Sequence, residues 1–198
     1  MVLPNQLTVL RIILTPVFLV LFLSGEPILI QISLVVFIIA AITDWYDGWL
    51  ARKFNYITEW GKFLDPLADK ILTATAFVAF VIIGMIPLWM VILIIVRDLV
   101  ITLLRVYSDY KKINFTTSKS AKWKTFLQMF FLYYLLLFYT LKTFPALREN
   151  YRFWFNTLLD NGTIYAAMLI ITIFTVVTGV TYFISNRKLI RQLFKHEA

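Results

Sequence analysis

Long runs of hydrophobic residues, separated by short polar stretches, recur along the chain. A helix that crosses a lipid bilayer needs about 20 mainly apolar residues. The segments that meet this length run over residues 5–24, 28–52, 64–84, 87–107, 120–141 and 163–185. The pattern therefore predicts an all-helical (all-α) integral membrane protein with six transmembrane helices, in a single domain that covers residues 1–198.

The composition supports a membrane protein over the alternatives. Hydrophobic residues make up 61% of the chain and charged residues 15%, against about 45–50% and about 25% in soluble domains. A soluble fold of this size could not bury so much apolar surface. Cysteine is absent from the sequence, which excludes a disulfide scaffold, and intrinsically disordered chains are much less hydrophobic.

The distribution of Lys and Arg predicts how the helices are oriented. Basic residues concentrate in two links, after the second and after the fourth predicted helix, and in the C-terminal tail. Cytoplasmic loops carry such an excess, so we expect both termini at the cytoplasmic face of the cell membrane. The net charge of +8 then needs no nucleic-acid partner. On the opposite side, residues 142–160 include an aromatic run that predicts a connector lying on the membrane surface.

Charged residues also stand at the end of the second predicted helix, where ionisable side chains are costly and usually functional. The spacing i, i+3, i+4, i+7, i+8 puts five positions on one helical face. These positions are Asp44, Asp47, Gly48, Ala51 and Arg52. The small residues leave room for a ligand beside the helix, and Arg52 is a candidate phosphate clamp.

The third predicted helix carries a second pair of acids near its start. Asp65 and Asp69 are four residues apart, so they lie within about 5.4 Å of helical rise. Gly61 precedes Asp65 by the same spacing. It shares their face only if the helix begins before it, whereas Pro66 is typical of a first helical turn.

These four aspartates would repel one another strongly in a low-dielectric setting, so they predict a bound cation. Without cysteine, and with His196 as the one histidine, the ligands are all oxygen, which favours Mg²⁺ or Mn²⁺. Two divalent ions would balance the four charges, as in two-metal phosphoryl-transfer sites. One alternative is pairing of the aspartates with Arg52, Lys53, Lys62 and Lys70. Another is a divalent-cation transporter, although its acids would sit nearer the membrane midplane.

A set of basic residues predicts a second binding site. Arg97 and Arg105 are eight residues apart, hence on one face of the fourth helix, and Arg97 lies well inside the apolar stretch. Together with Lys122 and Lys124 they suit the phosphate of an acceptor substrate. In the alternative interpretation Arg97 pairs with neighbouring structure, and the lysines merely follow the positive-inside rule.

The pattern Asp-x2-Asp-Gly-x2-Ala-Arg-x8-Gly-x3-Asp-x3-Asp over residues 44–69 resembles the signature of the CDP-alcohol phosphotransferases. The resemblance implies a six-helix membrane enzyme, generally a homodimer, that moves a phosphatidyl-type group from a CDP-linked lipid to an alcohol and releases CMP. It implies one metal held by Asp44, Asp47 and Asp65, and a second held by Asp44, Asp65 and Asp69. Asp69 is similar to the family's general base. The implied CDP-lipid contacts are Gly48, Ala51, Arg52, Thr58 and Gly61.

The resemblance extends to family members that make phosphatidylglycerol phosphate. The segment 4–11 is similar to their N-terminal segment, which implies that Asn5 and Thr8 lie close to the CDP-lipid; the alternative is a helix cap. The stretch 121–125 is also similar, with Ala121 where glycine is expected. These similarities imply CDP-diacylglycerol as donor and glycerol 3-phosphate as acceptor. A sister enzyme that uses inositol phosphate, inositol or serine stays open as an alternative.

Overall fold

The computed structural model describes residues 3–54, 59–111, 115 and 119–195, and all regular secondary structure within them is α-helical. The helices are α1 (Leu3–Leu23), α2 (Pro27–Phe54), α3 (Glu59–Ile82), α4 (Leu88–Tyr110), α5 (Lys119–Leu141), α6 (Pro145–Asn150), α7 (Arg152–Leu158) and α8 (Asn161–Lys195). This confirms the all-helical prediction for the described residues. Each predicted segment corresponds to one of the long helices, and the predicted surface connector contains the short helices α6 and α7.

Several helices extend beyond the predicted apolar segments. Helix α3 begins at Glu59 rather than near residue 64, so Pro66 lies inside the helix and not in its first turn. Helix α8 continues to Lys195, past the predicted end at residue 185. A search for apolar runs stops at the first charges, whereas helical hydrogen bonding continues into the polar zone. The two motif segments therefore lie on helix ends that project from the apolar stretches.

The described helices include stretches suited to a bilayer. Three of them are long and apolar enough to cross it: Gln6–Leu23, Lys119–Leu141 and the stretch Arg152–Leu193 that contains most of α8. Helix α2 adds a shorter apolar stretch, Pro27–Thr43. Because such surfaces are stable only in lipid, the chain is a membrane protein.

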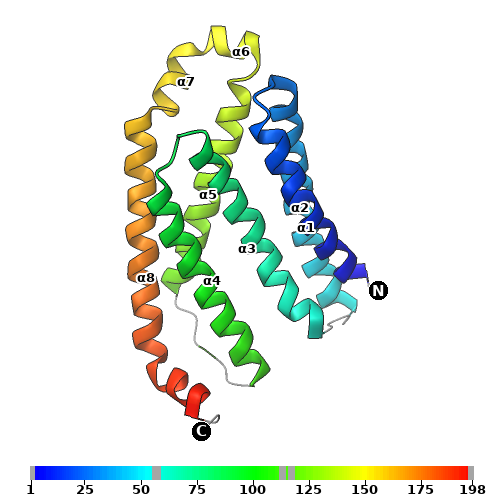
Figure 1. The fold of residues 1–198 in the computed structure, drawn as a ribbon, viewed down its shortest axis with the longest axis vertical. Coiled ribbons are helices and arrows are strands. Elements are labelled where there is room, and N and C mark those ends of the chain that lie inside the picture. Colours follow the sequence, from blue (N-terminus) through cyan, green and yellow to red (C-terminus); the bar gives the residue numbers. More distant parts are fainter. Residues whose placement is uncertain (1–2, 55–58, 112–114, 116–118, 196–198) are drawn as a thin grey trace.

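The long helices form one bundle (Figure 1). Helix α1 packs on α2 and α3, α4 packs on α3 and α8, and α5 packs on α2, α3 and α8. The helices α6 and α7 lie at one end of the bundle, and the chain termini lie toward the other (Figure 1). That second end is also where α2 finishes and α3 begins, so the motif segments share it with the termini.

Aromatic packing holds α1 against α2 and α3. The ring centroid of Phe18 lies 5.1 Å from that of Phe37, and the centroid of Phe22 lies 5.2 Å from that of Phe80. Tyr139 of α5 joins the cluster at 5.2 Å from Phe22. Tilted and edge-on aromatic pairs of this kind add to the energy of burial. The cluster fixes the spacing of the helices that carry the motif.

A tight turn reverses the chain between α3 and α4. Gly84 has φ +77°, a left-handed conformation that glycine adopts without strain. Its N–H donates to the carbonyl of Val81 at 2.9 Å, and the N–H of Met85 donates to the carbonyl of Phe80 at 3.0 Å, which is the Schellman pattern of helix ends. The turn folds α4 back along α3, so residues near the start of α3 meet residues in the second half of α4.

Candidate active site

The two motif aspartates of α3 lie one helical turn apart, as predicted. Because α3 begins at Glu59, Gly61 is inside the helix and the condition for a shared face with Asp65 and Asp69 is met. Thr8 of α1 is buried, and its hydroxyl donates to Oδ1 of Asp65 at 2.5 Å. This hydrogen bond ties α1 to α3 and orients the Asp65 carboxylate.

The motif positions of α2 are described only by their backbone. Positions 44–52 lie in one uninterrupted helix, which the shared-face prediction requires. The structure describes the backbone but not the side-chain surroundings at seven predicted positions: Asn5, Asp44, Asp47, Gly48, Ala51, Arg52 and Gly61. Thr58 lies wholly outside the described residues. Among the described side chains, no three acidic, histidine or cysteine residues stand together as a metal site would need. The four-aspartate metal site therefore stays a prediction.

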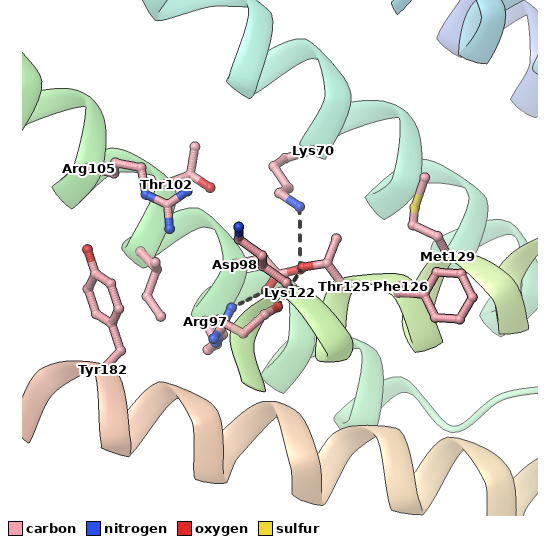
Figure 2. Close-up of a pocket in the computed structure, with 12 residues that line it drawn as sticks. Lys70, Arg97, Asp98, Thr102, Arg105, Lys122, Thr125, Phe126, Met129 and Tyr182 are labelled. Atoms are coloured by element: carbon pink, nitrogen blue, oxygen red, sulfur yellow. Dashed lines mark hydrogen bonds and ion pairs between the residues drawn. The ribbon is translucent and has the colours of Figure 1, made fainter. Parts of the chain in front are cut away.

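Asp98 of α4 is the centre of a buried ion cluster. Its side chain is 6% exposed, and its Oδ1 accepts hydrogen bonds from Lys124 of α5 and, at 3.1 Å, from Arg97. The ammonium group of Lys70, from α3, lies 3.9 Å from Oδ2 (Figure 2). One carboxylate thus collects cations from three helices, which compensates charges that would be costly to bury alone.

Lys70 also connects this cluster to the motif aspartates. Its ammonium group lies 3.9 Å from Oδ2 of Asp69 as well as 3.9 Å from Asp98. Both separations exceed hydrogen-bond length, and the Asp69 side chain is 34% exposed. Lys70 therefore pairs with Asp69, as the alternative interpretation expected, but neutralises its charge only weakly. The ion cluster and the motif aspartates are therefore direct neighbours.

A cavity of about 490 Å³ opens beside the ion cluster. Its polar lining comes from four helices and consists of Lys70, Arg97, Asp98, Thr102, Arg105, Lys122, Thr125 and Tyr182 (Figure 2). Arg105 and Lys122 are exposed, whereas Arg97 and Asp98 lie deeper. Among these described lining residues, four cations face one carboxylate, so the cavity is strongly cationic and suits an anion.

The predicted acceptor-binding residues divide into two groups. Arg97, Arg105 and Lys122 line the cavity, and their role in acceptor binding stays a prediction. Lys124 is not among the lining residues, because its fully buried side chain pairs with Asp98. Arg97 also has the neighbouring partners that the alternative interpretation expected, since its second terminal nitrogen donates to the hydroxyl of Thr178 at 3.2 Å.

Helix α8 approaches Arg97 closely at a glycine. A Cβ atom at Gly179 would stand 3.1 Å from Cγ of Arg97. The hydrogen bond from Arg97 to Thr178 lies next to this contact, so α8 both makes room for the arginine and anchors its guanidinium. The sequence patterns assigned no role to these α8 residues or to Asp98. An acid next to an arginine inside an apolar run was the available signal for Asp98.

Comparison with known proteins agrees with the motif. The chain belongs to the CDP-alcohol phosphatidyltransferase family, whose model matches residues 1–178. The family resemblance drawn from residues 44–69 is thereby confirmed.

Individual relatives are similar over most of the chain. A protein of Bacillus subtilis is 36% identical over 199 residues, which cover 93% of this chain and 94% of the relative. A protein of Rickettsia typhi is 37% identical over 68% of this chain and 76% of its own length, and one of Salmonella paratyphi A is 40% identical over 67% and 75%. Each of the three is named CDP-diacylglycerol–glycerol-3-phosphate 3-phosphatidyltransferase.

The ion cluster predicts a large stability effect at Asp98. Asp98→Asn removes the carboxylate charge that compensates the buried Lys124, so we expect a loss of about 3 kcal/mol in the free energy of unfolding, measured by denaturation in detergent micelles. Asp109→Asn, at an exposed acid of the same helix, is the matched control and should change little. Equal stability of the two variants would contradict the role given to Asp98.

Proposed function

We propose that this protein transfers the phosphatidyl group of CDP-diacylglycerol to glycerol 3-phosphate, forming phosphatidylglycerol phosphate and CMP. The observation that carries the proposal is the position of Lys70, 3.9 Å from both Asp69 and Asp98. It puts a cationic cavity directly beside the candidate general base. The activity named for the relatives from Bacillus, Rickettsia and Salmonella supports the same pair of substrates.

The cavity suits an acceptor that carries a phosphate. A dianion brought to the membrane edge without paired cations would cost several kcal/mol. Arg105 and Lys122 meet it at the exposed side, and Arg97 meets it deeper, where Asp98 and Thr178 hold the guanidinium in place. An acceptor without a phosphate, such as free inositol or serine, would bring no phosphate charge to compensate the loss of hydration of these cations.

The motif aspartates suit two hard divalent cations. Asp65 and Asp69 are partly exposed on one turn of α3, Thr8 donates to one oxygen of Asp65, and Lys70 neutralises the exposed Asp69 only weakly. With Asp44 and Asp47 they would hold Mg²⁺ or Mn²⁺ through oxygen ligands. When bound, such ions neutralise the diphosphate and the charge that develops on the leaving group.

The chain's own residues then carry the transfer. Asp69 accepts the proton of the acceptor hydroxyl, and that oxygen forms a bond to the β-phosphorus of CDP-diacylglycerol. The bond from the β-phosphorus to the bridging oxygen breaks, and CMP leaves with the electron pair. The cavity cations hold the acceptor's phosphate, which keeps the attacking hydroxyl oriented toward the β-phosphorus. The predicted lipid contacts at Asn5, Thr8, Gly48, Ala51, Arg52, Thr58 and Gly61 belong to the donor side.

We further infer six membrane spans, with both termini and the active site at the cytoplasmic face, and a homodimer. The position of the termini at one end of the bundle, together with the basic links, supports this orientation (Figure 1). The family resemblance supports the dimer. A site at the membrane edge lets a soluble acceptor meet a donor whose acyl chains stay in lipid.

Activity should depend on a divalent metal. Purified protein supplied with CDP-diacylglycerol and glycerol 3-phosphate should release CMP with Mg²⁺ or Mn²⁺ and stop when EDTA is added, because the aspartates cannot bind a diphosphate without cations. Restoring Mg²⁺ should restore CMP release. Full turnover in metal-free buffer would contradict the two-metal site.

Asp69→Asn should lose turnover while keeping most of the binding of CDP-diacylglycerol, since the amide cannot accept the proton but still offers an oxygen. Single-turnover CMP release and donor binding measure the two effects separately. Asp109→Asn serves again as the control for an aspartate outside the site. Near-native turnover of Asp69→Asn would mean that another group is the base.

Arg105→Ala should raise the KM for glycerol 3-phosphate by roughly tenfold or more, the value of a hydrogen bond to a charged group, and leave the donor KM near its original value. Lys111→Ala removes an exposed cation just after the same helix, outside the cavity lining, and should affect neither constant. A parallel rise in both constants for Arg105→Ala would argue against acceptor binding.

A further inference from the structure

Tyr182 of α8 is a buried cavity residue without a partner for its hydroxyl. The side chain is 5% exposed and lines the cationic cavity. Its hydroxyl oxygen is buried and donates to no acceptor within the described part of the chain; the Arg105 guanidinium nearby can itself only donate. The ring rises from α8 and directs its hydroxyl toward Arg105 of α4 (Figure 2). A polar group in this state is rare in folded proteins and calls for a ligand or a water molecule.

Packing holds the ring in this position. Phe115 contacts it edge-on at a centroid distance of 6.1 Å, and Phe183 at 6.3 Å. A phenylalanine would make the same contacts without burying an unpaired hydroxyl, so packing alone does not explain the oxygen.

The surroundings of the hydroxyl determine what kind of ligand suits it. The cations that line the cavity, among them Arg97, Arg105 and Lys122, can only donate hydrogen bonds. Asp98, the one carboxylate among the described lining residues, already accepts from Arg97 and Lys124. The charged lining residues therefore leave the phenolic proton without an acceptor, and an anionic ligand would supply one that also matches the surrounding charge.

We propose that Tyr182 is a further binding residue for the acceptor substrate, and that its hydroxyl donates a hydrogen bond to a phosphate oxygen of glycerol 3-phosphate. The inference rests on the proposed function and extends it to α8, a helix that carries none of the motif. Arg97 and Arg105 would meet the phosphate from α4 and Tyr182 from α8, so the two helices would enclose it.

The test is Tyr182→Phe, which removes one oxygen atom and keeps the ring. We expect the KM for glycerol 3-phosphate to rise roughly tenfold, as for loss of a hydrogen bond to a charged group, with the donor KM unchanged. Tyr134→Phe is the matched control. Its hydroxyl donates to the carbonyl of Leu158 at 2.6 Å, outside the cavity lining, so this variant should be less stable but keep both constants.

A binding measurement separates this inference from the proposed function. Inorganic phosphate should raise the unfolding temperature of the wild-type protein in micelles, with half the maximal shift reached at a roughly tenfold higher concentration in Tyr182→Phe. Without ligand, Tyr182→Phe should be about as stable as the wild type, because the phenolic proton has no acceptor to lose within the described part of the chain. If the wild type releases no CMP with glycerol 3-phosphate, the proposed function fails, and the phosphate titration still tests Tyr182.

Two outcomes would overturn the inference. The first is an unchanged phosphate titration in Tyr182→Phe, which would mean that the hydroxyl does not meet the phosphate. The second is an equal change in the donor and acceptor KM, which would mean that the variant disturbs the site as a whole.

Discussion

The buried carboxylate of Asp98 is the interaction on which the arrangement of the site depends. Lys70, Arg97 and Lys124 come from three different helices, and without an anion between them their charges would repel in a low-dielectric interior. Asp98 compensates this repulsion and so holds α3, α4 and α5 together at the motif end of the bundle. It also leaves other cations, Arg105 and Lys122, available to the cavity.

This arrangement explains how one membrane domain can bring two unlike substrates together. The aspartates of α3 stand on one side of Lys70 and the cationic cavity on the other. In the proposed function, the side chain of Lys70 would therefore stand between the region for the cation-bound diphosphate and the region for the acceptor's phosphate. Helix α8 completes the second region, where Thr178 anchors Arg97 and Tyr182 lines the wall.

The helices and the motif could be predicted because both follow from local patterns. Apolar runs located every long helix, and the four-residue spacing put Asp65 and Asp69 on one turn. The start of α3 could not be predicted, since the preference of proline for a first turn gave way to a helix that continues through Pro66.

The partners of Asp98 could not be predicted either, because they depend on which faces of separate helices meet. Lys122 and Lys124 look equivalent in the sequence. In the structure Lys122 lines the cavity, whereas Lys124 is buried and pairs with Asp98. Tyr182 gave no signal at all, since an aromatic residue in an apolar helix is ordinary until its unpaired hydroxyl is seen.

The central claim is that the cationic cavity receives a phosphate-bearing acceptor next to Asp69, and that this acceptor is glycerol 3-phosphate. The most direct measurement is CMP release from CDP-diacylglycerol by the purified protein, compared side by side for glycerol 3-phosphate, inositol phosphate, inositol and serine. The account predicts clear preference for glycerol 3-phosphate, with phosphatidylglycerol phosphate as the lipid product. Preference for inositol phosphate would contradict the choice of acceptor, and preference for inositol or serine, which carry no phosphate, would contradict the role of the cavity itself.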